Sequence, residues 1–174
     1  AVFGGATVSW MNEETSEVGS VRLTPPEGID PVAFIPDFEL RTAAARAALP
    51  ATVPHGDASF NVARGALLAA ILSGGAQASG GVNLHALLME ATRDRLHQEQ
   101  RRAAMEPSLA LVDWLRGAGF AAVVSGAGPT VLSLEQVGAD IRRDAAGAGW
   151  RVVPLAVAAS GVQITRGSLA KVEF

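Results

Sequence analysis

A glycine-rich turn between two apolar segments is the part of the sequence best suited to hold a ligand. Residues 119–124 and 130–134 are largely apolar, and the string SGAGP at residues 125–129 separates them. Glycine adopts positive φ and has no Cβ, so two glycines around one alanine allow backbone amides to converge on an anion. A tight strand-to-strand turn without a ligand explains the same residues, because the chain has neither a GxGxxG nor a GxxxxGK[ST] motif.

Arginines offer a second kind of chemistry, the binding of a carboxylate. Thr42 and Arg46 are four residues apart on a predicted helix, so a hydroxyl and a planar guanidinium share one face. The simpler alternative is that Thr42 caps the helix and Arg46 is solvated. Between residues 90 and 105 the apolar spacing fails after Leu96. That segment can therefore leave helical geometry and direct one of its arginines inward, and spacing alone does not choose which.

Other polar residues have weaker support as a site. Asn61 and Arg64 lie on one apolar helix, either as a polar pair that positions a loop or as groups satisfied within the core. The three histidines are His55, His85 and His97, and none is spaced as zinc ligands are. We therefore expect no metal site built by this chain alone, and the absence of a GxSxG string gives no support to a hydrolase triad.

Composition narrows the class of protein. The 174 residues are 49% hydrophobic and 18% charged, which suits one domain or slightly more with a substantial core. A net charge of −3 and an aromatic content of 5% argue against nucleic acid or an anionic membrane as the main partner. The chain has no cysteine, which fits the cytoplasm, and no apolar run long enough to span a bilayer. A small-molecule enzyme is the favoured class.

Periodicity and turn residues predict a mixed fold. Extended segments are expected at residues 6–11, 18–23, 32–35, 38–40, 121–124, 130–134 and 150–158. Helices are expected at residues 42–49, 57–73, 84–96, 108–117 and 137–146, with Thr42 and Asp57 as N-caps of the first two. Strands and helices do not alternate strictly, and several strands are separated by short turns. This order predicts an α+β domain with an antiparallel sheet covered by helices.

Two segments resemble a known family. The string AVVSGAGPT at residues 122–130 resembles the third motif of the GHMP small-molecule kinases, and IPDFELRTAAARAALP at residues 35–50 resembles the (V/I)PxFELxTxxAR..LP stretch of homoserine kinases. Over residues 1–159 the chain resembles the C-terminal part of that kinase family in its actinobacterial type. The resemblance implies a ferredoxin-like C-terminal domain at residues 24–160, remnant strands of the N-terminal domain at residues 1–23, and a peripheral tail at residues 161–174.

The resemblance also implies an activity and a set of site residues. The family transfers the γ-phosphoryl group of ATP, with Mg²⁺, to the side-chain hydroxyl of L-homoserine, which yields O-phospho-L-homoserine for threonine biosynthesis. The family's HQPYR string corresponds to HQEQR at residues 97–101, so Glu99 and Gln100 depart from it. The substrate-binding residues implied are Thr42, Arg46 and Arg101. The phosphate-side loop implied is Ser125, Gly126, Ala127 and Gly128.

One part of the family pattern has no counterpart in the chain. The PxxxGLGSSA motif, whose amides bind the ATP phosphates, does not occur, and the chain starts without methionine. We therefore expect a fragment whose catalytic residues lie upstream of Ala1 and which does not turn over alone, because phosphoryl transfer depends on positioning and charge neutralisation. The alternatives are another GHMP kinase, acting on a mevalonate derivative or a sugar, and a non-catalytic amino-acid-binding module. A homodimer fits the resemblance, although no residue indicates one.

Overall fold

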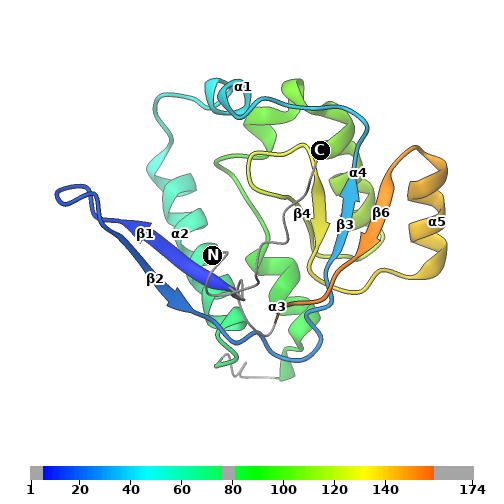
Figure 1. Cartoon of the computed structure of the whole chain (residues 1–174), viewed down its shortest axis with the longest axis horizontal. Coiled ribbons are helices and arrows are strands. Elements are labelled where there is room, and N and C mark those ends of the chain that lie inside the picture. The colour runs from blue at the N-terminus through cyan, green and yellow to red at the C-terminus, as the bar shows by residue number, and fades with distance from the viewer. Residues whose placement is uncertain (1–5, 76–80, 159–174) are drawn as a thin grey trace, which may run out of the picture. The chain divides into compact units, whose positions relative to one another are not determined.

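The computed structural model describes residues 6–75 and 81–158 (Figure 1). Residues 24–157 form one compact unit, and the residues up to Leu23 belong to another. In the latter, β1 (Thr7–Met11) and β2 (Val18–Arg22) pair in antiparallel register with Trp10 opposite Gly19. A Cβ at Gly19 would overlap the indole of Trp10, so only glycine allows this cross-strand contact. The extended segments predicted at residues 6–11 and 18–23 are confirmed as strands, and they form a hairpin.

A four-stranded antiparallel sheet organises the larger unit. Its strands, in spatial order, are β4 (Ala122–Val124), β5 (Val131–Ser133), β3 (Val32–Ile35) and β6 (Arg151–Pro154). Helices follow β3, and α5 (Ala139–Gly147) connects β5 to β6. This β-α-β-β-α-β connectivity and strand order are those of a ferredoxin-like sheet. The predicted α+β class with a helix-covered antiparallel sheet is confirmed.

One face of the sheet packs on α4 (Glu106–Gly117) and α5 (Figure 1). Alternation along the strands places Val32 and Phe34 on this face, and the register sets Val131 opposite Phe34. These side chains are buried against α4, whose Leu115 is 0% exposed. The same face therefore holds the main core of the unit, and α4 fixes the position of β4 and of the turn that follows it.

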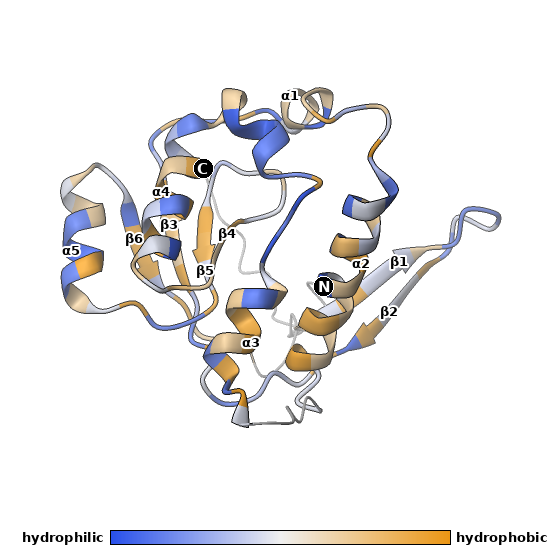
Figure 2. Ribbon diagram, turned by 180° about the vertical axis from the view of Figure 1, so that it is seen from behind, coloured by the Kyte–Doolittle hydropathy of each residue, from blue (hydrophilic) through white to orange (hydrophobic). Residues whose placement is uncertain are grey.

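The remaining helices form a second apolar cluster. α2 (His55–Leu72) packs on α3 (Leu84–Ala91) through Ile71 and Leu88, which are both buried. Asn83 begins α3, because its side-chain oxygen accepts a hydrogen bond from the amide of Ala86 at 2.9 Å. Figure 2 shows hydrophobic residues concentrated in the strands and in α2 and α3. Two short elements, α1 (Thr42–Ala47) and the 3₁₀ helix η2 (Glu99–Ala104), contact each other.

Several predicted boundaries are wrong. Arg41, not Thr42, is the N-cap of α1, and Thr42 is its first helical residue. Pro54, not Asp57, caps α2, because the Pro54 carbonyl accepts the amides of Asp57 and Ala58 at 3.0 Å. Residues 38–40 do not form a strand, since β3 ends at Ile35, before Pro36.

The last helix and strand boundaries also differ from those predicted. α5 begins at Ala139 and β6 ends at Pro154, so the helix starts later and the strand is shorter than expected. The predicted tail at residues 161–174 lies outside the described residues. Within the described residues, no helix combines the length and the apolar composition needed to cross a bilayer.

The substitution Leu115→Ala should lower the free energy of unfolding by about 3 kcal/mol, because it leaves a cavity between α4 and the sheet. Urea unfolding followed by circular dichroism measures this change. The control Leu155→Ala removes the same atoms from a residue that is 44% exposed and should cost less than about 0.5 kcal/mol. Equal losses in the two variants would contradict the assigned core.

Candidate functional site

The carboxylate of Asp94 organises the segment that follows α3. Its Oδ2 accepts the amides of His97 at 2.8 Å and Gln98 at 2.6 Å, and its Oδ1 accepts the amide of Leu96 at 3.3 Å. The side chain of Asn61 on α2 donates to the same Oδ1 at 2.6 Å and accepts the amide of Arg95 at 2.9 Å. The segment therefore leaves helical geometry because one carboxylate captures amides that a helix would use.

This arrangement corrects one prediction and bears on another. The helix expected over residues 84–96 ends at Ala91. The sequence offered two roles for Asn61 and Arg64, and Asn61 has the first of them, because it positions a loop. Arg64 instead pairs with Glu90, and its guanidinium lies 3.6 Å from the centre of the Phe60 ring. Both roles are fixed by partners distant in sequence.

The hydrogen bonds outweigh the effect of burial on the pKa of Asp94. Burial of this carboxyl would raise its pKa, but hydrogen bonds from the Gln98 amide, the Asn61 side chain and His97 lower the pKa to about 2. Asp94 is therefore ionised at neutral pH and acts only as an acceptor.

Arg101 is the arginine that turns inward. Its residue is 9% exposed, its Nε donates to the carbonyl of Ala45 at 3.2 Å, and its Nη1 donates to the carbonyl of Gly126 at 3.1 Å. Arg93 and Arg95 instead lie over the ring of Phe60, at 5.1 and 3.9 Å. One guanidinium thus connects η2 to α1 and to the glycine turn, three segments that are far apart in the sequence.

Backbone hydrogen bonds close the glycine turn itself. The amide of Ser125 donates to the carbonyl of Thr130 at 2.8 Å, and that of Gly128 donates to the carbonyl of Ser125 at 3.0 Å. Gly128 has φ +87°, and a Cβ there would lie 2.7 Å from the sulfur of Met105, so close packing excludes a side chain. At Gly126, with φ +60°, a Cβ would meet nothing within 4 Å. The turn is packed at Gly128 and open at Gly126.

Two side chains anchor the turn to its surroundings. The side-chain oxygen of Gln98 accepts the amide of Val124 at 2.8 Å, at the end of β4. The hydroxyl of Ser108, at the start of α4, donates to the carbonyl of Pro129 at 2.6 Å. The Asp94 segment and the turn are therefore parts of one hydrogen-bonded structure.

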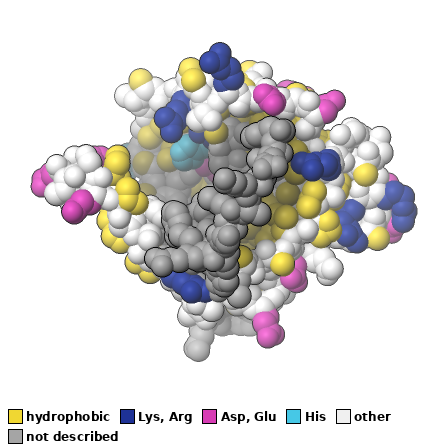
Figure 3. Space-filling model, viewed as in Figure 1, with side chains coloured by type: hydrophobic (Ala, Val, Ile, Leu, Met, Phe, Trp, Pro, Cys, Tyr) yellow, Lys and Arg dark blue, Asp and Glu magenta, His cyan; other side chains and the backbone are white. Residues whose placement is uncertain are grey.

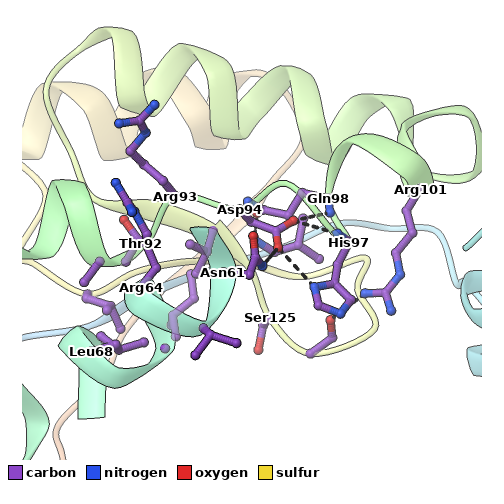
Figure 4. A pocket seen from close by; sticks show the side chains of 18 residues that line it. Asn61, Arg64, Leu68, Thr92, Arg93, Asp94, His97, Gln98, Arg101 and Ser125 are labelled. Carbon is purple, nitrogen blue, oxygen red and sulfur yellow. Dashed lines mark hydrogen bonds and ion pairs between the residues drawn. The ribbon is translucent and has the colours of Figure 1, made fainter. Parts of the chain in front are cut away.

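These elements line an open cavity of about 760 Å³ (Figure 4). Its polar end carries Asp94, His97, Gln98, Arg101, Ser125 and Gly126, and apolar side chains such as Leu68 and Leu132 line the other part. In the space-filling view of Figure 3, a histidine and a basic side chain lie together at the rim of a hollow. The cavity can hold a small anionic molecule by a guanidinium at one end and contact its apolar part at the other.

The cavity brings together some of the predicted site residues and not others. Arg101, Ser125 and Gly126 line it. Ala127 and Gly128 belong to the same turn but are not among its lining residues, and neither are Thr42 and Arg46. The latter two are exposed on α1, whose Ala45 accepts the bond from Arg101. Their proposed roles as ligand-binding residues remain predictions.

Sequence reasoning missed Asp94 and Gln98 as site residues. Both lie in a run of charged and polar residues that resembles a solvated surface, and their partners Asn61 and Val124 are distant in the sequence. The one available signal was the break in apolar spacing after Leu96. Arg116 was also missed: it donates to Met89, Thr92 and Ala122, and burial lowers its pKa. It fastens the end of α3 to β4.

No group of three His, Asp or Glu side chains suited to hold a metal ion occurs within residues 6–75 and 81–158. The acidic residue in the cavity, Asp94, already accepts hydrogen bonds from three backbone amides and one side-chain amide. The described residues therefore assign no ligand to Mg²⁺.

Comparison with known proteins identifies the domain. The family model for the C-terminal domain of GHMP kinases matches residues 67–146, which include α3, the Asp94 segment, Arg101 and the glycine turn. Residues 67–146 belong to the GHMP kinase family. A homoserine kinase of Streptomyces avermitilis is 43% identical over 164 residues, and one of Corynebacterium efficiens is 43% identical over 165 residues. These alignments cover 94% and 91% of the chain but 50% of each relative, so the chain spans about half the length of the curated relatives that it matches.

Solved structures of GHMP kinases share the fold. A crystal structure of homoserine kinase from Cytophaga hutchinsonii superposes with a TM-score of 0.70 at 19% identity, over 89% of this chain and 49% of that one. A putative homoserine kinase from Listeria monocytogenes gives a TM-score of 0.56 at 25% identity, over 95% of this chain and 54% of that one. The chain therefore shares the arrangement of sheet and helices seen in these two solved structures.

Acid should test the role of Asp94 in holding this site. Its pKa is lowered from 3.8 to about 2 on folding, so its stabilising contribution is complete above about pH 4 and is lost as the pH falls to 2. This contribution is about 2 kcal/mol. Urea unfolding between pH 7 and pH 2 should show Asp94→Asn less stable than the wild type at neutral pH, with the difference shrinking in acid.

The exposed Asp37 supplies the control for this measurement. Because Asp37 is exposed, Asp37→Asn should change the free energy of unfolding at neutral pH by less than about 0.5 kcal/mol. A constant difference in stability between Asp94→Asn and the wild type from pH 7 to pH 2 would show that the carboxylate charge does not stabilise the loop.

Proposed function

We propose that this chain supplies the acceptor-binding part of a homoserine kinase. The reaction transfers the γ-phosphoryl group of ATP to the side-chain hydroxyl of L-homoserine and yields O-phospho-L-homoserine for threonine biosynthesis in the cytoplasm. The observation that carries the proposal is the identity of 43% to a homoserine kinase over 94% of the chain. Residues 1–23 are proposed to belong to the N-terminal GHMP domain and residues 24–160 to the C-terminal one.

Arg101 has the capacity to bind the carboxylate of the amino acid. A guanidinium has five N–H donors. The carbonyls of Ala45 and Gly126 take two of them, so three remain for other acceptors. A guanidinium held rigidly by two backbone carbonyls is oriented before the substrate arrives, which reduces the entropy lost on binding. Arg101 is therefore proposed as a substrate-binding residue, and its partners fix its direction.

Arg46 and Thr42 are proposed as a second pair of groups for the same carboxylate. Both are exposed on α1, and the Ala45 carbonyl beside Arg46 bonds to Arg101. That bond sets the distance between the backbone of α1 and the guanidinium of Arg101. A carboxylate between the two arginines would receive charge-assisted hydrogen bonds from both, which discriminates an amino acid from a sugar or another neutral alcohol.

The glycine turn fits the phosphate side of the reaction. Gly126 leaves open space where a side chain would stand, and the amides of Gly126 and Ala127 have no acceptor among the described residues. Such amides suit an anionic oxygen. We propose Ser125, Gly126, Ala127 and Gly128 as the wall beside the transferred phosphoryl group. ATP and Mg²⁺ supply that group and neutralise its charge, and most of their ligands are proposed to lie outside this chain.

Release of ADP from Mg-ATP tests the function. The complete protein product of the gene should turn over L-homoserine, and mevalonate and galactose should give no more than the background rate. The 174-residue chain alone should release no ADP above background, because it lacks the PxxxGLGSSA phosphate loop. Turnover with mevalonate or galactose would establish another GHMP kinase. Binding of homoserine without turnover of any acceptor would favour an amino-acid-binding module.

Arg46→Ala in the complete protein should raise the KM for L-homoserine by roughly thirtyfold, a loss of about 2 kcal/mol, and leave the KM for ATP unchanged. Arg46 is a cleaner test than Arg101, whose loss would also remove the bonds to Ala45 and Gly126. The matched control is Arg143→Ala, which removes an exposed arginine paired with Asp140 on α5. An unchanged KM for homoserine would show that Arg46 is a solvated surface residue that does not bind the substrate.

A further inference from the structure

His97 is the one residue at the polar end of the cavity whose role is not yet explained. Its ring Nδ1 lies 3.0 Å from Oδ1 of Asp94, and its side chain is 49% exposed where that of Asp94 is 13% exposed. Asp94 is itself held by the amides of Leu96, His97 and Gln98 and by Asn61. The His97 ring is therefore hydrogen-bonded to a carboxylate whose own position is fixed, and its orientation is restricted.

The bond to Asp94 decides which ring nitrogen carries the proton. An ionised carboxylate only accepts hydrogen bonds, so Nδ1 must donate. In the neutral imidazole, Nε2 then has a free lone pair. Within the described part of the chain, Nε2 has no hydrogen-bond partner. Because His97 lines the cavity, it offers this ligand-free acceptor at the polar end.

His97 and Arg101 together match the two charged groups of an α-amino acid. They are four residues apart, both line the cavity, and in Figure 4 their side chains point toward one another. Arg101 retains three donors, which suit a carboxylate, and His97 provides an acceptor, which suits an ammonium group. A substrate alcohol that has a carboxylate but no amine could use the donors of Arg101 but not the hydrogen-bond acceptor of His97.

We propose that His97 is a specificity residue whose Nε2 accepts a hydrogen bond from the α-ammonium group of the amino acid whose carboxylate binds Arg101. This inference rests on the proposed homoserine kinase function, since it concerns the same acceptor site. Asp94 acts through His97 as a positioning residue: it fixes the tautomer and the direction of the ring. The arrangement selects amino acids over hydroxy acids of the same length.

A purely structural role would require only the bond between Nδ1 and Asp94. Two substitutions separate the two roles. His97→Asn places an amide near the position of Nδ1, so it keeps the donor to Asp94 and removes the polar group at Nε2. His97→Gln reaches the position of Nε2 with an amide oxygen and loses the donor near Nδ1. The two variants therefore make opposite predictions.

The experiment measures the KM for L-homoserine and the inhibition constant of 4-hydroxybutyrate, which lacks the amine, in the complete protein. His97→Asn should raise the KM for homoserine tenfold or more, with a smaller change in kcat, and His97→Gln should restore most of this loss. The inhibition constant of 4-hydroxybutyrate should stay within about twofold of the wild-type value in both variants, because no ammonium group is involved. The KM for ATP should not change.

Three results would overturn the inference. A wild-type KM in His97→Asn, with a raised KM in His97→Gln, would show that His97 only holds the loop. Equal weakening of homoserine and 4-hydroxybutyrate would show that the variants distort the Arg101 end of the cavity. A wild-type protein that does not turn over homoserine would refute both the proposed function and this inference. The wild type is therefore measured before any variant, so that the two failures are distinguished.

Discussion

The site depends on one ionised carboxylate, that of Asp94, which accepts hydrogen bonds from three consecutive residues of its own loop and from Asn61 on α2. These bonds end the helical path after α3 and set the direction in which the chain enters η2. That direction determines where three side chains at the polar end of the cavity lie. Gln98 reaches the amide of Val124, His97 faces the cavity, and Arg101 is carried to the glycine turn.

Burying Arg101 has a cost that its partners only partly offset. A guanidinium removed from water loses hydration worth several kcal/mol, and two backbone carbonyls recover part of it without supplying a negative charge. A structural arginine of this kind is normally paired with a carboxylate, yet among the described residues no acidic side chain bonds to it. An anionic ligand would complete the pairing. The same unpaired charge that weakens the isolated fold therefore favours the binding of a carboxylate, which is a physical reason to expect an anionic ligand there.

The local sequence pattern predicted the helices and strands of the fold but not the side-chain contacts that connect them. The strands around Phe34 and Val131 and the helix around Leu115 follow from apolar periodicity, and their pairing into an antiparallel sheet is confirmed. Arg101 could be chosen among its neighbours only by resemblance to a family string, although the break after Leu96 indicated that one arginine would turn inward. The end of α3 was not predicted, because apolar spacing does not show that Asp94 accepts the amides of Leu96, His97 and Gln98. The contact of Asp94 with Asn61 and the roles of Gln98 and Arg116 depend on partners more than twenty residues away. Spacing along one segment carries no information about such partners.

The remaining question is how Arg46, exposed on α1, can act with a cavity that it does not line. α1 has six residues, only Ala45 of which is buried, and the carbonyl of Ala45 is held by Arg101. A helix this short contributes little stability of its own, so its position is set by that bond and by its contact with η2. If a carboxylate binds Arg101 through the donors that remain, Nε can keep its bond to Ala45, and α1 stays next to the ligand. The two arginines are thus linked through one backbone carbonyl, and the proposed acceptor site would consist of Arg101 together with α1.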